Sequence, residues 1–233
     1  MKISGSVALV TGANRGLGAA FARALLDRGA RTVYAAARNP ATITGEGLTP
    51  LQLDVTDPAA VSAAADRCAD VDLLINNAGI SRSGTADLDS ARAEMETNYF
   101  GTLSMSRAFA PVLARNGGGA LVNVLSVLSL VTFPQVSTYA ASKAAAWSLT
   151  NALRVELKEQ GTLVVGVHAG YIDTDMAARV TGPKISPEEV VAQALDAVEA
   201  GAYEVLADTI SRETRAALSG ELDLLYPALA TRG

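Results

Sequence analysis

The sequence predicts an α/β fold in which helices cover both faces of a doubly wound parallel sheet. Short aliphatic or β-branched runs alternate with amphipathic segments of helix length along most of the 233 residues, which is the pattern of repeated βαβ units. Candidate strands such as VALV, LLIN and LVVGV are apolar throughout, as expected for parallel strands buried on both faces. No linker rich in proline, serine or charge interrupts this order, so we expect one domain over residues 1–233.

The first half of this order begins with a strand at residues 7–10, an aliphatic run that leads directly into glycines. An amphipathic segment at 16–28 has the length of a helix, and an alanine-rich apolar run at 31–37 suits a second strand. We expect a short third strand at 51–53 and a helix at 58–68, which begins at a proline.

The second half continues the alternation. The long helix that we expect in it is rich in alanine, which allows close packing against a sheet or another helix. In order, we expect a strand at 72–75, a helical region at 87–115, a strand at 120–125, a long helix at 138–160, a strand at 163–168, a helix from Pro187 and a last strand at 203–206.

Composition excludes several classes of protein. With 49% apolar and 18% charged residues, the chain has the profile of a compact globule. The net charge of −5 and the lack of a basic run argue against a nucleic-acid partner. The most apolar stretch, 121–133, is well short of the roughly 20 residues that cross a bilayer, so we expect no membrane segment. The single cysteine, Cys68, cannot form an internal disulfide and is expected to be a buried hydrophobe in the cytoplasm.

A glycine turn follows the first expected strand. Gly12, Gly16 and Gly18 lie in the segment TGANRGLG, and a helix-like segment continues from it without a break. Such a turn lets a backbone approach closely, and the helix N-terminus can hold a pyrophosphate. The spacing is G-x-x-x-G-x-G rather than G-x-G-x-x-G. An ordinary strand-to-helix loop therefore remains an alternative for the turn by itself.

The end of the second strand indicates which dinucleotide the turn would hold. Arg38 stands 20 residues after Gly18, where NAD-binding folds commonly place an acid for the ribose diol. An arginine there can pair with a 2′-phosphate, and Arg15 can add a second positive charge, so both favour NADP(H). Solvated surface arginines are the alternative for each. Asp54 can accept a hydrogen bond from the adenine amino group, or it can begin a helix.

Tyr139 and Lys143 form the first catalytic pattern. Residues four apart on a helix share a face, so both can address one site. A nearby ammonium favours the phenolate form, and we expect Lys143 to bring the pKa of Tyr139 down toward a useful range. Alone, this spacing is weak, because a tyrosine and a lysine often share a solvated helix face.

Further polar residues follow expected strands at the carboxyl edge of the sheet, where such folds bind ligands. Ser126 comes 13 residues before Tyr139 and can hold a substrate oxygen, while Ser129 is better explained as a turn residue. Asn76 to Gly79 follow the fourth strand, and their amides can fix the sheet edge and a nicotinamide ribose. Asn98 is unusual in a helix interior and can extend a proton relay from Lys143.

This set of motifs resembles the short-chain dehydrogenase/reductase family. The glycine turn, the segment after the fourth strand and the stretch AGYIDT at 169–174 occur in the family's order over roughly residues 4–176. The resemblance implies a Rossmann fold with seven parallel strands in the order 3-2-1-4-5-6-7, a cofactor half at about 1–125 and a catalytic half at about 126–233. It implies the catalytic residues Asn98, Ser126, Tyr139 and Lys143. It implies cofactor contacts from Gly12, Asn14, Arg15, Gly16, Leu17, Gly18, Arg38, Asp54, Val55, Asn77, Ala78, Gly79, Tyr139, Lys143, Gly170, Ile172 and Thr174.

One position departs from the family's pattern, because Ala169 stands where a proline usually precedes the glycine. This change loosens the loop without removing a chemical group. His168, before it, lacks the partners in sequence that a metal or base role would need, so we expect a satisfied loop histidine and no metal site.

The expected activity is NADP(H)-dependent transfer of a hydride between nicotinamide and a carbonyl or secondary alcohol carbon, as in carbonyl reductases. An NAD(H)-dependent alcohol dehydrogenase, a non-catalytic NADP(H) sensor and a methyltransferase on a similar fold are the alternatives. The short insert at 175–186 suggests an open cleft for small or aromatic carbonyl compounds. Its apolar lining candidates are Leu128, Phe133, Val136 and Met176, each of which can equally be core. The family implies a homodimer or homotetramer.

Overall fold

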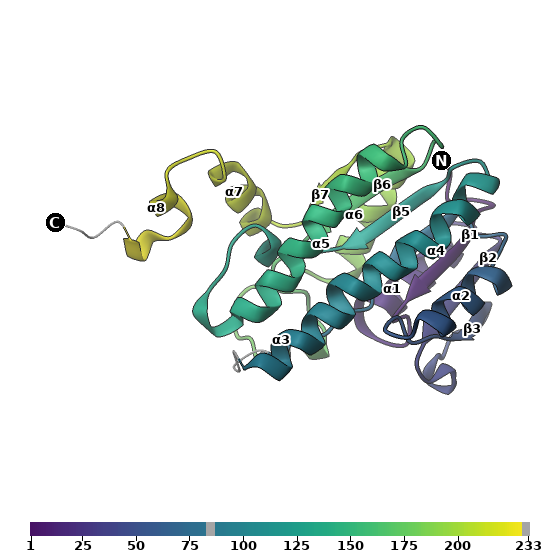
Figure 1. The fold of residues 1–233 in the computed structure, drawn as a ribbon, viewed down its shortest axis with the longest axis horizontal. Helices are drawn as coiled ribbons and strands as arrows, with labels where there is room; N and C mark the ends of the chain where they lie inside the picture. The colour runs from purple at the N-terminus through teal and green to yellow at the C-terminus, as the bar shows by residue number, and fades with distance from the viewer. Residues whose placement is uncertain (83–86, 230–233) are drawn as a thin grey trace.

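The computed structural model describes residues 1–82 and 87–229, and Figure 1 shows the arrangement of its elements. Seven strands form one sheet in the order β3-β2-β1-β4-β5-β6-β7, and every neighbouring pair is parallel. The predicted fold class and strand order are thereby confirmed. The strands are β1 (Val7–Thr11), β2 (Thr32–Ala37), β3 (Leu48–Gln52), β4 (Leu73–Asn76), β5 (Ala120–Val124), β6 (Leu163–His168) and β7 (Glu204–Leu206).

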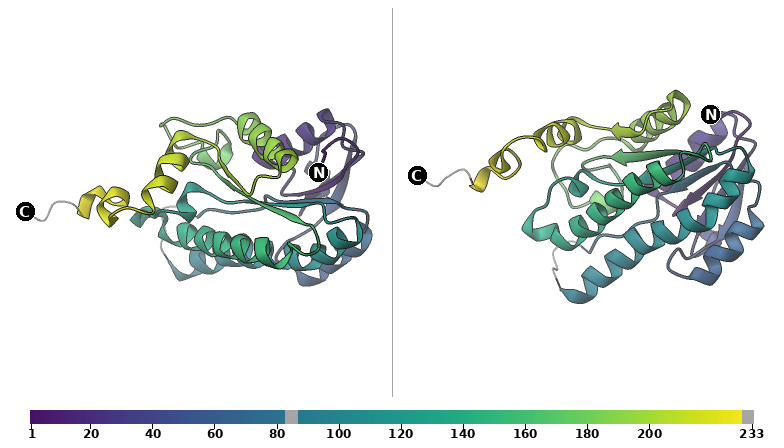
Figure 2. Two further views of the ribbon diagram at one scale, coloured as in Figure 1. Left: turned by 90° about the horizontal axis from the view of Figure 1, so that it is seen from above. Right: turned by 45° about the horizontal axis from the view of Figure 1, so that its top comes forward.

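Helices cover both faces of the sheet, as Figure 2 shows. The apolar side chains of β1 and β4 are buried along their whole length, because each strand contacts a helical layer on either side. One core contains Phe21 and Val198, and the other contains Phe109 and Leu153. The first layer is α1 (Gly16–Asp27) with α6 (Pro187–Ala200), and the second is α2 (Pro58–Arg67), α4 (Thr102–Arg115) and α5 (Ser137–Glu156).

Two elements differ from the sequence prediction. The third strand begins at Leu48 rather than residue 51, and it includes Pro50, which weakens a strand signal. It forms the edge of the sheet, where a residue without an N–H is tolerated. The expected helical region at 87–115 contains α3 (Leu88–Met95), a π-helical segment at Glu96–Gly101, and then α4.

The last part of the described chain leaves the sheet and projects away from it (Figures 1 and 2). It consists of α7 (Thr209–Ala217) and the short α8 (Leu222–Leu225). Neither helix was expected from the sequence, because α7 has few apolar residues and α8 is only four residues long. Within residues 1–82 and 87–229, no helix combines the length and apolarity that crossing a membrane requires.

Candidate cofactor and catalytic site

The glycine turn between β1 and α1 depends on the absence of side chains. Gly12 and Gly16 have φ angles of +64° and +52°, which residues with a Cβ rarely adopt. A Cβ at Gly18 would lie 2.1 Å from the carbonyl oxygen of Gly12, well inside any allowed contact. The three glycines therefore permit a tight turn in which the chain passes close to itself.

This turn packs against two other segments that the sequence singles out. The hydroxyl of Thr11 accepts hydrogen bonds from the amides of Asn77 and Ala78, at 3.0 and 2.9 Å. The Asn77 side chain donates to the carbonyl of Thr11 at 2.9 Å and to that of Gly12 at 3.2 Å. The structure thus brings the turn and the segment after β4 together, and it adds Thr11, which the sequence analysis did not identify as a site residue.

The first turn of α1 is open to a ligand. No side chain caps its N-terminus, and its first turn holds no acidic residue, whereas Asp57 caps α2 and Ser186 caps α6. Leu17 is buried and fixes the start of the helix on the core. Uncapped N–H groups at a helix N-terminus suit an anionic group such as a phosphate. A methyl of Thr174 lies beside this turn, 3.2 Å from where a Cβ of Gly16 would be.

A cleft of about 400 Å³ extends from the end of β2 and includes Arg38 and Asp54 in its lining. The side chain of Asp54 accepts hydrogen bonds from the amide and hydroxyl of Thr56 at 3.0 and 2.7 Å, and these bonds lower the pKa of Asp54. The alternative that Asp54 begins a helix is wrong, because Asp57 is the cap of α2. Val55, beside it, is buried.

Arg15 and Arg38, the two arginines that favour NADP(H), are both exposed, but their contacts differ. Arg38 makes no ion pair with any residue in the described parts of the chain, so its guanidinium is available at the cleft. Arg15 lies 3.4 Å from Asp175, with both side chains exposed. An exposed pair of this kind contributes little stability, and it can exchange for a stronger anion.

Tyr139 and Lys143 lie on one face of α5, as their spacing predicts. The ammonium of Lys143 donates to the carbonyl of Val124 at 2.9 Å and lies 5.9 Å from the centre of the Tyr139 ring. Lys143 is buried, and burial lowers its pKa to about 8, because a charged ammonium loses its hydration there.

The pKa of Tyr139 moves opposite to the sequence expectation. Burial raises the pKa of Tyr139 to about 12, a hydrogen bond with Ser126 opposes this shift, and the charge of Glu94 adds to it. The expectation that Lys143 lowers this pKa is therefore wrong for the structure. Desolvation of the phenolate is the largest cause, and Lys143, whose ammonium donates to a main-chain carbonyl, is not among the groups that shift this pKa. Tyr139 holds its proton at neutral pH.

Asn98 lies at the centre of the π-helical segment and is buried. Its side chain accepts from the amide of Ile80 at 2.8 Å and donates to the carbonyl of Ile80 and the hydroxyl of Ser142, both at 2.9 Å. A Cβ on Gly79 would lie 3.1 Å from Asn98 Oδ1 and 3.5 Å from Lys143 Nζ. Asn98 and Lys143 are thus brought together around Gly79, while the proton relay through Asn98 stays a prediction.

Glu94 and Ser142 are site residues that the sequence analysis missed. Ser142 joins Asn98 to α5, and its place between Tyr139 and Lys143 is the signal that identifies it. Glu94 is fully buried, and one oxygen accepts from the amide of Arg82 at 2.6 Å. Its other oxygen has no hydrogen-bond partner in the part of the chain that is described. Glu94 lies four residues before Asn98, a spacing that places two helical residues on one face.

Comparison with known proteins identifies the family to which this geometry belongs. Residues 6–184 match the family model described as short chain dehydrogenase. The chain is a member of the short-chain dehydrogenase/reductase family. Two curated relatives agree with this assignment. Dehydrogenase/reductase SDR family member 7B of Bos taurus is 32% identical over 99% of this chain and 80% of its own length. The 3-oxoacyl-(acyl-carrier-protein) reductase of Vibrio cholerae is 34% identical over 76% of this chain and 77% of its own.

Solved structures of this oxidoreductase family are similar along nearly the whole chain. A short chain dehydrogenase from Burkholderia cenocepacia in complex with NADP has a TM-score of 0.94 and 45% identity, covering 99% of this chain and 100% of that chain. The NADPH-bound carbonyl reductase from chicken fatty liver has a TM-score of 0.75 and 28% identity, covering 84% of this chain and 91% of that chain.

The segment after β6 contains further residues that the family resemblance implies for the cofactor site. The amide of Gly170 donates to Asp208 at the start of α7, at 2.6 Å, and Ile172 forms an isolated bridge with Ile185. Of the apolar lining candidates that the sequence suggests, Phe133 and Met176 are exposed, and Leu128 and Val136 are partly buried, so none is plain core. Among the described residues, no group of histidine, cysteine or acidic side chains can hold a metal ion.

Proposed function

We propose that the protein is an NADP(H)-dependent oxidoreductase that interconverts a carbonyl compound and its alcohol. The observation that carries this proposal is the placement of Tyr139, hydrogen-bonded with Ser126, on the same helix face as buried Lys143. All three lie at the carboxyl edge of the sheet, where doubly wound folds bind their ligands. Similar proteins crystallised with NADP and NADPH support the choice of cofactor.

The residues present fit a dinucleotide with a 2′-phosphate. The turn is closed to side chains at Gly18, the start of α1 is uncapped, and Arg38 lines the cleft beyond it. When bound, the nicotinamide ring accepts or releases the hydride. The residues proposed to hold the cofactor are Gly12, Asn14, Arg15, Gly16, Leu17, Gly18, Arg38, Asp54, Val55, Asn77, Ala78, Gly79, Tyr139, Lys143, Gly170, Ile172 and Thr174.

The side chains of the site supply the proton chemistry. The hydroxyl of Ser126 holds and polarises the carbonyl oxygen of the substrate, and Tyr139 donates a proton to that oxygen as it gains charge. The raised pKa of Tyr139 keeps the phenol protonated at neutral pH, which suits the direction of reduction. Lys143, with a pKa of about 8, lies next to the phenol. Its positively charged ammonium stabilises the phenolate that forms when Tyr139 gives up its proton.

The two alternatives differ in measurable ways. An NAD(H)-dependent alcohol dehydrogenase would bind NADH at least as well as NADPH, while a sensor would bind NADPH without turnover. Tyr139 beside the buried Lys143 and Ser126 favours catalysis over sensing, since binding alone does not need an acid beside a polarising hydroxyl. The exposed apolar side chains of Phe133 and Met176 favour small or aromatic carbonyl substrates.

The test is a titration with NADPH and NADH followed by nicotinamide fluorescence, and then an assay with ketones, aldehydes and quinones. We expect tighter binding of NADPH than NADH, and NADPH oxidation with at least one compound of the panel. If the protein bound neither NADPH nor NADH, the proposal would be contradicted, beginning with the glycine turn as a dinucleotide site. Tight NADPH binding with no turnover over a broad panel would favour the sensor.

Replacing Arg38 by aspartate should weaken NADPH binding selectively. A charged hydrogen bond to phosphate contributes about 1.5–3 kcal/mol, so we expect the Kd of NADPH to rise about 10- to 100-fold. The Kd of NADH should change little, because NADH has no 2′-phosphate. Arg31→Asp, at the opposite end of β2, makes the same charge change and is the control. Equal weakening of both dinucleotides by the Arg38 variant would contradict the role of Arg38.

Replacing Glu94 by glutamine should lower the pKa of Tyr139. The buried charge of Glu94 raises that pKa, and an amide removes the charge while keeping the shape. Alcohol oxidation needs the phenolate as base, so the rise of kcat/KM with pH should begin at lower pH in the variant. Glu96→Gln, an exposed carboxylate two residues away, is the control. An unchanged pH profile for Glu94→Gln would show that this charge does not act on Tyr139.

A further inference from the structure

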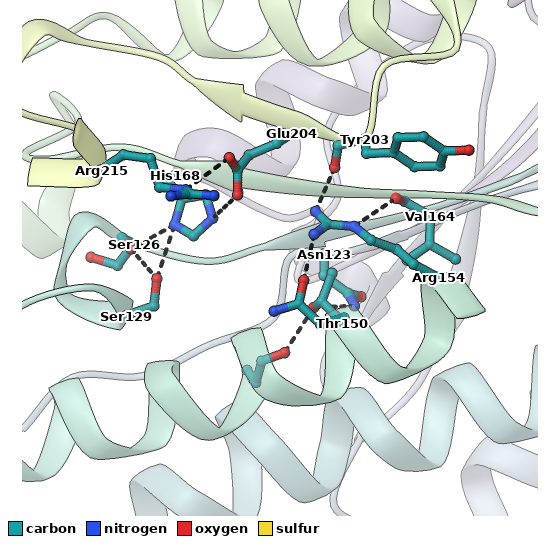
Figure 3. A network of polar contacts seen from close by, with 12 residues as sticks. Asn123, Ser126, Ser129, Thr150, Arg154, Val164, His168, Tyr203, Glu204 and Arg215 are labelled. Atoms are coloured by element: carbon teal, nitrogen blue, oxygen red, sulfur yellow. Dashed lines mark hydrogen bonds and ion pairs between the residues drawn. The ribbon is translucent and has the colours of Figure 1, made fainter. Parts of the chain in front are cut away.

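The only histidine in the sequence, His168, is buried at the end of β6 and lies behind Ser126 (Figure 3). It is not the loop histidine that the sequence suggests. Its Nδ1 lies 2.9 Å from the hydroxyl of Ser129 and 3.1 Å from the carbonyl oxygen of Ser126. The ring therefore contacts the main chain of a residue whose side chain hydrogen-bonds with Tyr139.

The main chain around Ser126 is held in two different ways. The amide of Leu125 donates to the carbonyl of Val167 in β6, and the amide of Val127 donates to that of Ala169, the residue after β6, each at 2.8 Å. The carbonyl of Ser126 instead accepts from the amide of Ser129 at 3.0 Å, from the Ser129 hydroxyl at 2.5 Å, and from His168 Nδ1. The position of this one peptide thus depends on side chains.

These contacts determine which ring nitrogen must carry the proton. The single hydroxyl proton of Ser129 is used on the carbonyl of Ser126, so Ser129 can only accept from His168. The Ser126 carbonyl is also an acceptor. Both oxygens facing Nδ1 therefore require an N–H there, since an unprotonated Nδ1 would place a lone pair against a carbonyl at 3.1 Å.

Charged groups face the other side of the ring. Nε2 lies 3.5 Å from one oxygen of Glu204, and the other oxygen of Glu204 pairs with Arg215 of α7 at 3.2 Å. Burial lowers the pKa of His168, Glu204 opposes this shift, and the charges of Arg154 and Arg215 add to it. The ring is neutral near pH 7 and has one N–H to place.

We propose that His168 is a positioning residue for Ser126. Its Nδ1–H holds the Ser126 carbonyl, together with the Ser129 hydroxyl, so that the Ser126 hydroxyl stays against the phenol of Tyr139. The catalytic part of this inference rests on the proposed oxidoreductase activity, whereas the position of the proton does not.

The first test reads the proton directly. Because the chain has one histidine, protein labelled with ¹⁵N-histidine and freed of any affinity tag gives a single pair of ring nitrogen signals. We expect a neutral ring near pH 7 with the proton on Nδ1. A neutral ring with the proton on Nε2 would overturn the proposal, because Nδ1 would then donate to neither oxygen.

The second test uses two variants that each keep a nitrogen at the position of one of the two ring nitrogens. The amide nitrogen of an asparagine replaces Nδ1, and that of a glutamine replaces Nε2. His168→Asn should keep a kcat near that of the unmodified protein. His168→Gln should lose about 10- to 100-fold in kcat, the range that a displaced catalytic group causes. The Kd of NADPH should stay unchanged in both variants, since His168 is not among the residues proposed to hold the cofactor.

A control separates positioning from stability. Thr150→Val on α5 removes a buried hydrogen bond that Asn123 of β5 donates to Thr150, and it should lower the Tm without changing kcat. Equal kcat values for His168→Asn and His168→Gln would overturn the proposal. If the unmodified protein oxidises no NADPH with any compound, the proposed function fails instead, and the ¹⁵N spectrum alone decides where His168 holds its proton.

Discussion

Tyr139→Phe is expected to lower turnover strongly while the protein still binds NADPH. The variant keeps the aromatic ring and loses only the hydroxyl that donates the proton, a function that contributes about 100- to 10,000-fold to a rate. We expect kcat to fall by about that factor, measured with any carbonyl compound that the unmodified protein reduces. The fold should be unaffected, because Phe fills the same space on α5.

Tyr171→Phe is the matched control for this experiment. Tyr171 is exposed on the loop after β6 and has no contact with Ser126 or Lys143 among those that the structure shows. Its variant should keep full activity. A Tyr139→Phe protein with the kcat of the unmodified protein would refute the assignment of Tyr139 as acid and base.

The second large effect is expected at the glycine turn. An alanine at position 18 would place its Cβ 2.1 Å from the carbonyl oxygen of Gly12 and 2.5 Å from the side-chain nitrogen of Asn77. Both are rigid neighbours, so the turn must open, at a cost of about 1–3 kcal/mol in the free energy of unfolding. We expect Gly18→Ala to bind NADPH too weakly for fluorescence titration to detect and to have a lower Tm.

Gly182→Ala serves as the comparison, because a Cβ at Gly182 meets open space and its φ is not in the left-handed region. This variant should match the unmodified protein in both measurements. If Gly18→Ala bound NADPH normally, the turn would not be the phosphate site.

The sequence predicts the sheet and most of the site because these depend on patterns within single segments. Continuous apolar runs identify strands such as β1 and β4, and the order of motifs places Ser126 and Tyr139 at one edge. Pro50 obscured the start of β3. A proline is tolerated in an edge strand, but the sequence alone did not show that this strand lies at the edge of the sheet. The π-helical turn around Asn98 likewise has no periodic signal of its own.

Properties that depend on the assembled molecule were not predictable. The pKa of Tyr139 rises because several elements bury it and Glu94 lies close, and neither fact follows from the spacing of Tyr139 and Lys143. His168 meets Ser126 across 42 positions of sequence, and no local pattern relates the two. Its surroundings make it more than the loop residue that its sequence position suggests.

The hydroxyl of Thr11, which accepts from the amides of Asn77 and Ala78, also bears on how the chain reaches its final state. The glycine turn is complete only when β4 has paired with β1, across more than 60 residues. Contacts of such long sequence separation form late, because closing the intervening loop is entropically unfavourable. The dinucleotide therefore binds only molecules in which β1 and β4 have already paired. Its binding shifts the folding equilibrium toward these molecules by mass action.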